Sequence, residues 1–190
     1  MPFTETGIPG LLVFEPKIFR DERGYFFESF NAKTFEEVGI KRNFVQDNQA
    51  YSSYGIVRGL HYQLAPHVQS KLVRAIQGEV LDVVVDVRGG SPTFGKQFSI
   101  VLSSENQKQL YVPRGFAHGY SVLSDTALFF YKCDNYYNRE AERGIAYNDV
   151  TLQIDWKIPA DKMILSEKDK LNKSFAEAEK NFVFDAGNPF

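Results

Sequence analysis

The expected fold rests on the stretch Lys71-Leu72-Val73-Arg74-Ala75-Ile76-Gln77-Gly78-Glu79-Val80-Leu81-Asp82-Val83-Val84-Val85-Asp86-Val87. It contains two runs rich in apolar and β-branched residues, Lys71 to Ile76 and Glu79 to Val87, divided by the turn pair Gln77-Gly78. Short runs of this composition between turn residues are typical of β-strands. The stretch therefore predicts two consecutive strands.

Similar runs recur along most of the chain. Further strands are predicted at Leu11 to Phe19, Tyr25 to Phe30, Phe44 to Tyr51, Gln97 to Leu102 and Ala127 to Lys132. Turn residues separate them at Asp21-Glu22-Arg23-Gly24, Arg88-Gly89-Gly90-Ser91-Pro92 and Pro113-Arg114-Gly115. An aromatic content of 15% also favours strands. The spacing predicts an all-β sandwich or barrel.

Two segments carry helix signals at the flanks of this β-rich region. Asn31 to Val38 has a capping residue at Asn31, and Ser166 to Lys180 begins with the capping residue Ser166. No internal repeat, low-complexity tract or linker interrupts the chain. We expect one domain over residues 1–190, with a C-terminal helix and tail at about 166–190.

Composition narrows the range of functions. The 190 residues carry a net charge of −2, which provides no strong field for nucleic acid or an anionic membrane. No apolar run is long enough to cross a bilayer, and Met1-Pro2-Phe3-Thr4-Glu5 does not resemble a signal peptide. Cys133 is the only cysteine, so an intramolecular disulfide is impossible. These features predict a cytoplasmic protein that binds neither nucleic acid nor membrane.

The densest group of reactive side chains lies in Val57-Arg58-Gly59-Leu60-His61-Tyr62-Gln63, followed ten residues after the histidine by Lys71. We expect neighbouring strands to present the guanidinium, the imidazole and the ammonium of this group. A lone histidine in a β-protein is more often a structural residue that is satisfied by hydrogen bonds. His61 becomes a candidate base only if other residues support that role.

Six motifs in series provide that support. They are Phe19-Arg20-Asp21-Glu22-Arg23-Gly24-Tyr25-Phe26-Phe27-Glu28, Phe44-Val45-Gln46-Asp47-Asn48, Arg58-Gly59-Leu60-His61-Tyr62-Gln63, Pro113-Arg114-Gly115-Phe116-Ala117-His118-Gly119, Tyr131-Lys132-Cys133-Asp134-Asn135-Tyr136-Tyr137 and Leu165-Ser166-Glu167-Lys168-Asp169. In order and spacing, over about residues 8 to 170, they resemble the dTDP-4-dehydrorhamnose 3,5-epimerases, a family of cupin-type enzymes. The resemblance implies a cupin-like jelly roll or β-barrel with short flanking helices.

The resemblance also implies a reaction and a set of catalytic residues. The substrate would be dTDP-4-dehydro-6-deoxy-D-glucose, a dTDP-linked 4-keto-6-deoxy sugar, which is epimerised at C3 and C5 to dTDP-4-dehydro-L-rhamnose. The C4 ketone acidifies the hydrogens on both carbons. His61 matches the family's base, Lys71 the cation that stabilises the enolate, Tyr131 the acid that returns the proton, and Asp169 the carboxylate that orients the histidine.

An alternative for Asp169 follows from its local sequence. Ser166-Glu167-Lys168-Asp169 places an acidic residue three positions after a serine, which resembles a helix capping box with Asp in place of Glu or Gln. One carboxylate cannot serve both roles fully. From the sequence, Asp169 is either the partner of His61 or a helix cap.

Substrate-binding residues are implied by the same resemblance. Planar guanidinium groups pair well with phosphate oxygens, which suits Arg23 and Arg58, and an aromatic ring suits the pyrimidine base. The full set is Phe19, Arg23, Glu28, Gln46, Asp47, Asn48, Arg58, His118, Tyr137, Glu142 and Lys168. Gln46 and Asn48 can also be described simply as alternate residues on one strand face, and either arginine could form a surface ion pair.

No cofactor or metal is expected. The chain lacks the glycine-rich motifs of dinucleotide and nucleotide sites, which disfavours a nicotinamide-dependent route. Where related barrels carry a His-x-His metal pair, this chain has His61-Tyr62-Gln63, and the remaining histidines are His67 and His118.

The family resemblance further implies a homodimer in which the segment of Arg23 and Glu28 reaches the partner's site. Three alternatives stay open from the sequence alone. The chain could epimerise a single carbon, it could move the keto group of a related sugar, or it could bind a sugar nucleotide without catalysis.

Overall fold

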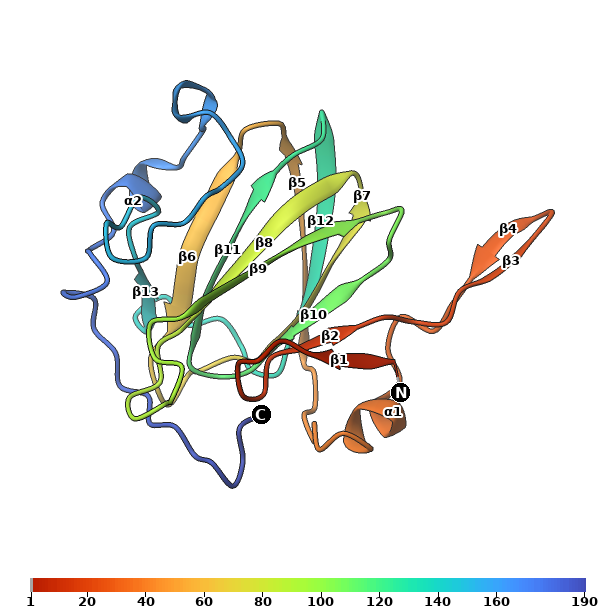
Figure 1. Ribbon diagram of the computed structural model, residues 1–190, viewed down its shortest axis with the longest axis horizontal. Coiled ribbons are helices and arrows are strands. Elements are labelled where there is room, and N and C mark those ends of the chain that lie inside the picture. Colours follow the sequence, from red (N-terminus) through yellow and green to blue (C-terminus); the bar gives the residue numbers. More distant parts are fainter. Residues whose placement is uncertain (1) are drawn as a thin grey trace.

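Two antiparallel sheets packed face to face form the body of the protein (Figure 1). The computed structural model describes residues 2–190. The six-stranded sheet has the order β1 (Phe3–Glu5), β2 (Leu12–Phe14), β10 (Gln109–Val112), β7 (Lys71–Gln77), β12 (Thr126–Cys133) and β5 (Gln46–Ser53). The five-stranded sheet has the order β13 (Glu142–Gly144), β6 (Val57–Gln63), β11 (Phe116–Val122), β8 (Glu79–Asp86) and β9 (Gln97–Ser103). The prediction of an all-β, cupin-like fold is confirmed.

Strands that follow one another in the chain often lie in opposite sheets. Strands β7 and β8 are separated only by Gly78, yet they belong to different sheets. Gly78 has a φ of +72°, and a Cβ there would lie 2.1 Å from the carbonyl oxygen of Thr126, so this crossing requires glycine. Strands β6 and β7 are also in different sheets, and the expectation that Arg58, His61 and Lys71 come from neighbouring strands was wrong.

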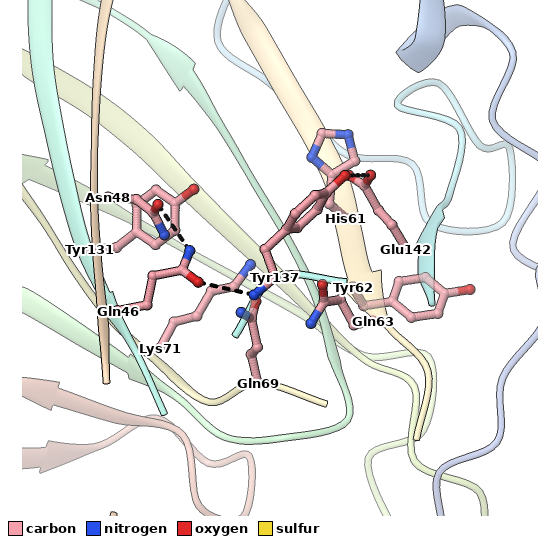
Figure 2. Close-up of a pocket in the computed structure, with 10 residues that line it drawn as sticks. All are labelled: Gln46, Asn48, His61, Tyr62, Gln63, Gln69, Lys71, Tyr131, Tyr137 and Glu142. Carbon is pink, nitrogen blue, oxygen red and sulfur yellow. Dashed lines mark hydrogen bonds between the residues drawn. The ribbon is translucent and has the colours of Figure 1, made fainter. Parts of the chain in front are cut away.

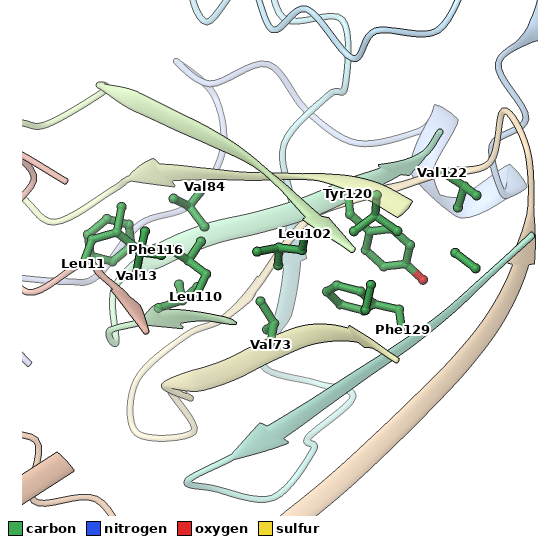
Figure 3. Packing of buried hydrophobic residues seen from close by; sticks show 14 of the residues in the cluster. Leu11, Val13, Val73, Val84, Leu102, Leu110, Phe116, Tyr120, Val122 and Phe129 are labelled. Carbon is green, nitrogen blue, oxygen red and sulfur yellow. The ribbon is translucent and has the colours of Figure 1, made fainter. Parts of the chain in front are cut away.

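The core lies between the sheets, where alternate residues of each strand point inward (Figure 3). Val73 and Phe129 project from the six-stranded sheet, and Val84 and Tyr120 project from the five-stranded sheet. A second cluster, which includes Trp156 and Phe175, covers the other face of the five-stranded sheet. Because both faces of the sheet are covered, every residue of β8 after Glu79 is buried, and most of them are valine or leucine.

Most predicted strands are confirmed to within one or two residues at each end. The run from Leu11 to Phe19 was wrong as a single strand, because β2 ends at Phe14 and β3 (Phe19–Asp21) begins a separate hairpin. Pro16, which has no amide hydrogen for a strand ladder, lies between them. The run from Tyr25 is shorter than predicted, since β4 covers only Gly24–Phe26. The hairpin of β3 and β4 extends away from the two sheets (Figure 1).

The first predicted helix is present. Helix α1 covers Ala32–Glu36, and the Asn31 side chain accepts a hydrogen bond from the Lys33 amide as predicted.

The second helix is much shorter than predicted. Helix α2 covers only Glu167–Lys170, whereas the sequence suggested residues 166–180. Beyond it, Phe175 and Ala178 are buried against the five-stranded sheet, and the Asp149 carboxylate accepts a hydrogen bond from the Phe175 amide at 2.7 Å. These tertiary contacts override the helix propensity of this segment.

The C-terminal tail is an ordered arm in the structure. Gly89 exchanges backbone hydrogen bonds with Phe182 and Phe184, and the Arg88 guanidinium donates to the carbonyl of Pro189 at 3.1 Å. Among residues 2–190, no helix is long and apolar enough to cross a membrane.

Candidate active site

A cleft between the two sheets collects most of the predicted site residues (Figure 2). Its outer part encloses a cavity of about 150 Å³. An inner part lies beside it, and His61, Lys71 and Tyr131 line both. His61 projects from β6 in one sheet, whereas Lys71 and Tyr131 project from β7 and β12 in the other. The candidate catalytic groups therefore occupy facing walls.

His61 and Asp169 form a direct pair. Nε2 of His61 lies 2.5 Å from Oδ1 of Asp169, whose side chain is almost completely buried. Burial raises the pKa of Asp169, but the hydrogen bond and the charge of His61 outweigh this effect and bring the pKa below its ordinary value. Because Asp169 engages Nε2, the second ring nitrogen, Nδ1, is left to face a ligand.

The two explanations for Asp169 can now be separated by atom. The Ser166 hydroxyl accepts a hydrogen bond from the Asp169 amide at 3.1 Å, so the serine half of the cap is present. The Asp169 carboxylate, in contrast, is turned towards His61. The backbone of Asp169 belongs to the helix cap, and its side chain belongs to the histidine pair.

Gly59 and Gly119 allow strand β6, which carries His61, to lie close to strand β11. A Cβ on Gly59 would lie 2.6 Å from Cα of Gly119, so β6 and β11 are closer here than side chains permit. Gly59 also has a φ of +122°, in a region that favours glycine. The strand register shifts at this point, between His118, which faces His61, and Tyr120, which faces Arg58.

Lys71 lies on the same inward face of β7 as the core residue Val73. Its Nζ is 5.6 Å from the centre of the Tyr131 ring. Burial lowers the pKa of Lys71, and the charges of Cys133, Asp82 and Glu142 oppose that change. An ammonium in such a partly desolvated place interacts strongly with an anion that enters the cleft.

The Tyr131 hydroxyl retains its proton at neutral pH. Burial raises the pKa of Tyr131 to about 12, and Cys133 contributes further to the rise. The residue lies across the cleft from His61, on the other sheet. Base and acid candidates can thus reach opposite faces of a flat ligand held between the walls.

The inner part of the cleft contains a second imidazole–carboxylate pair. His118 Nε2 lies 2.8 Å from Oδ2 of Asp82, and both residues are buried. Arg58 also lines this part and donates to the Ser52 hydroxyl at 3.2 Å. The structure thus brings His118 and Arg58 to the same cleft as His61.

Polar groups surround the outer part of the cleft. The Gln46 side chain donates to Asn48 at 3.1 Å and accepts from the Tyr137 amide at 3.0 Å (Figure 2). The Tyr137 hydroxyl donates to Glu142 at 2.7 Å, and Lys168 forms an ion pair with the same carboxylate. Burial raises the pKa of Glu142, but the hydrogen bonds from Lys168 and Tyr137 outweigh it and lower the pKa overall. Five predicted binding residues therefore form one network.

Four predicted binding residues lie outside the cleft. Phe19, Arg23 and Glu28 belong to the projecting hairpin and the segment that follows it. The Arg23 side chain is 85% exposed and pairs with Asp21 at 2.5 Å. Asp47 lies on the opposite face of β5 from Gln46 and Asn48, because strand side chains alternate, and it pairs with Lys132 at 3.0 Å.

The structure adds residues that the sequence did not nominate. They are Ala50, Tyr62, Gln63, Gln69, Gly119, Tyr120 and Phe129. Strand periodicity could have identified four of them. Ala50, Gln63, Tyr120 and Phe129 lie two positions from Asn48, His61, His118 and Tyr131. Among residues 2–190, no three His, Cys, Asp or Glu side chains are grouped so that they could hold a metal ion.

The fold is a jelly roll of the cupin type. One wall of its cleft carries a histidine–aspartate pair, and the other carries a lysine and a tyrosine. This arrangement is suited to proton transfer. The family model for dTDP-4-dehydrorhamnose 3,5-epimerase matches residues 5–177. The chain belongs to this family.

Individual relatives agree with this assignment. A dTDP-4-dehydrorhamnose 3,5-epimerase from Shigella flexneri is 53% identical over 180 residues, which are 94% of this chain and 98% of the relative. A crystal structure of dTDP-6-deoxy-D-glucose-3,5-epimerase from Legionella pneumophila, in complex with dTDP-4-keto-L-rhamnose, is 47% identical with a TM-score of 0.92, covering 97% of this chain and 98% of that one.

A third relative differs in the number of carbons that it inverts. The structure of a double mutant of a 3′-monoepimerase from Streptomyces bikiniensis, in complex with dTDP, is 32% identical with a TM-score of 0.84. The match covers 90% of this chain and 86% of that chain. The same fold thus supports both inversion at one carbon and inversion at two.

Proposed function

We propose that this protein epimerises C3 and C5 of dTDP-4-dehydro-6-deoxy-D-glucose to give dTDP-4-dehydro-L-rhamnose. The observation that carries the proposal is the position of the His61–Asp169 pair across the cleft from Lys71 and Tyr131. Membership of the family, at 53% identity to one member, supports the choice of substrate and the inversion of both carbons. The residue roles below are part of the proposal.

His61 acts as the base. The ketone at C4 lets the electron pair of the broken C3–H or C5–H bond move onto the C4 oxygen as an enolate, and the proton passes to Nδ1 of His61. Asp169 holds the ring through Nε2 and stabilises the imidazolium that forms, as a buried carboxylate does in a catalytic triad.

Lys71 stabilises the enolate. Negative charge develops on the C4 oxygen, and a cation already positioned in a partly desolvated cleft is suited to receive it. Lys71 satisfies this description because it lines both parts of the cleft beside His61.

Tyr131 returns a proton to the carbon from the face opposite His61. Its hydroxyl is protonated at neutral pH, and it approaches from the other sheet. The proton that leaves and the proton that returns are the whole chemical change at each carbon, so the reaction requires neither an oxidant nor a reductant.

The outer network holds the nucleotide in this proposal. Tyr137 provides an aromatic face for the base, and Gln46 and Asn48 provide polar edges near it. Arg58 is a phosphate ligand, for which a guanidinium is well suited. The ion pair between Glu142 and Lys168 opens, and both side chains then bind polar groups of the substrate.

We further propose a homodimer that completes each site. Phe19 and Arg23 lie outside the cleft of their own protomer, on a hairpin with exposed aromatic residues such as Phe26, and Glu28 lies in the segment that follows it. A second copy of the chain would provide the cleft that they reach. A cytoplasmic location remains our prediction from the sequence.

Turnover of dTDP-4-keto-6-deoxyglucose in deuterated water, followed by NMR, tests the function directly. We expect deuterium at both C3 and C5, and none above background with His61→Ala. Label at one carbon would indicate a monoepimerase, and a moved carbonyl would indicate a keto-isomerase. Binding without any label would indicate a non-catalytic sugar-nucleotide protein. Each of these three results would contradict the proposal.

A further inference from the structure

The inner part of the cleft contains a buried hydroxyl without a partner. Within residues 2–190, six buried side-chain polar atoms form no hydrogen bond in the structure, and the Tyr120 hydroxyl is one of them. The other five belong to Ser70, Arg74, Asp82, Tyr111 and Asn172. Of these six residues, only Tyr120 lines the cleft. A buried polar group without a partner is costly, so this hydroxyl calls for a ligand that fills the cavity.

The ring of Tyr120 is held firmly in place. Only 4% of the residue is exposed, and its ring stacks on Phe129 at 4.2 Å between centroids. Figure 3 shows the two rings side by side between the sheets. Rigid packing at this position means that the direction of the hydroxyl is determined before any ligand enters.

The polar neighbours of Tyr120 leave its hydroxyl without a hydrogen bond. On the two adjacent strands, its partners in register are Arg58 and Asp82. Nη2 and Nε of Arg58 donate to the Ser52 hydroxyl at 3.2 and 3.3 Å. One oxygen of Asp82 is bound to His118, and its other oxygen has no partner. The protein therefore surrounds the tyrosine hydroxyl with polar groups without satisfying it.

We propose that Tyr120 is a specificity-determining residue whose hydroxyl donates a hydrogen bond to the C2 hydroxyl of the sugar. This inference rests on the proposed function. The sugar ring of the proposed substrate carries hydroxyls only at C2 and C3. Inversion at C3 moves the C3 hydroxyl to the other face of the ring. Of the two hydroxyls, the one at C2 can therefore remain the partner of a fixed donor throughout the reaction.

The test combines one substitution with one substrate change. Tyr120→Phe removes only the hydroxyl, and dTDP-4-keto-2,6-dideoxyglucose removes only its proposed partner. We expect Tyr120→Phe to lower kcat/KM for the 2-hydroxy substrate by roughly 3- to 10-fold, in the range of a neutral hydrogen bond. We expect kcat/KM for the 2-deoxy substrate to be the same in both enzymes.

Two controls separate this role from a structural one. The melting temperature of Tyr120→Phe should equal or exceed that of the wild type, because the substitution removes an unsatisfied buried group. Tyr111→Phe removes another unpartnered buried hydroxyl that does not line the cleft, and it should leave kcat/KM unchanged for both substrates.

Two results would overturn the inference. One is an unchanged kcat/KM of Tyr120→Phe on the 2-hydroxy substrate, and the other is an equal loss on both substrates. Either result, with the wild type still active, would leave the proposed function standing. Absence of turnover by the wild type would instead contradict the proposed function itself.

Discussion

Nε2 of His61 lies 2.5 Å from Oδ1 of Asp169, although the two residues are 108 positions apart in the chain. One belongs to β6 and the other to the four-residue helix α2. The contact sets the orientation of the imidazole and leaves Nδ1 free of Asp169. It also joins the short helix α2 to strand β6.

Replacement of Asp169 by Asn should greatly reduce turnover with little effect on folding. The amide cannot stabilise an imidazolium, and it can hold the ring in the wrong tautomer, so we expect kcat to fall by roughly 10²- to 10⁴-fold. Steady-state kinetics and a thermal melt of the same sample would measure both effects.

Ser166→Ala is the matched control, because it removes the cap and leaves the carboxylate. We expect it to lower the free energy of unfolding by about 1 kcal/mol while kcat changes far less than in Asp169→Asn. If Ser166→Ala and Asp169→Asn lowered kcat equally, the contribution of Asp169 to turnover would not come from its pair with His61.

Activity should decline at alkaline pH because Lys71 loses its proton. Burial lowers the pKa of Lys71, so the charged form is present below that lowered pKa and is lost as the pH rises through it. The pKa of Tyr131, about 12, is too high to cause the same decline. In a pH profile of kcat, Lys71→Arg should move the alkaline decline to higher pH, since a guanidinium stays charged. An unmoved decline would assign it to another group.

Tyr131→Phe should separate proton removal from proton return. His61 and Lys71 remain in this variant, so the substrate should still exchange its hydrogens with deuterated water. Inverted product should form at least about 100-fold more slowly, because general acid catalysis is lost. NMR can follow exchange and inversion in one sample. If the rates of exchange and inversion fell by the same factor, Tyr131 would not act in reprotonation alone.

The proposed exchange of hairpins between protomers can be tested by complementation. His61→Ala and Arg23→Ala should each be nearly inactive alone. In a mixed dimer, one cleft would combine an intact His61 with Arg23 from the partner, so mixing after mild dissociation should recover up to about a quarter of the wild-type activity for random pairing. If Arg23 served its own protomer, no mixture would recover activity, even where size-exclusion chromatography showed dimers.

Arg88 should be a major determinant of stability. It pairs with Asp86 at 2.8 Å in a buried site and also donates to the carbonyls of Pro9 and Pro189. Arg88→Met would leave the Asp86 charge buried and unpaired, at a cost of about 3–5 kcal/mol in the free energy of unfolding. Urea denaturation would measure the loss. Lys157→Met, which breaks an exposed ion pair with Asp155, should leave the melting temperature unchanged.

The same buried pair predicts a dependence of stability on pH. Burial raises the pKa of Asp86, but Arg88, Ser91 and Thr93 outweigh it and bring the pKa below its ordinary value. The stabilisation is therefore present above the ordinary pKa of an aspartate and is lost as the pH falls through the lowered one. In Arg88→Met, the acid-induced part of this loss should be smaller than in the wild type.

Several features could be predicted from the sequence because they depend on near neighbours in the chain. Alternation along a strand places Gln46 and Asn48 on one face of β5 and Asp47 on the other. Asn31 and Ser166 cap their helices through amides two and three residues away. The series of short strands and the six motifs were likewise sufficient for the fold class and the family.

Other features depend on contacts between distant segments, which local periodicity does not report. Strands β6 and β7 follow one another in the chain, yet packing of their apolar faces assigns them to opposite sheets, and this places His61 across from Lys71. Burial of Phe175 ends the second helix early. The Asp169 carboxylate had two possible partners in the sequence, and only the position of β6 beside α2 decided in favour of His61. Burial of Tyr120 beside an open cavity is likewise a property of the packed sheets, because desolvation exists only once the two walls have come together.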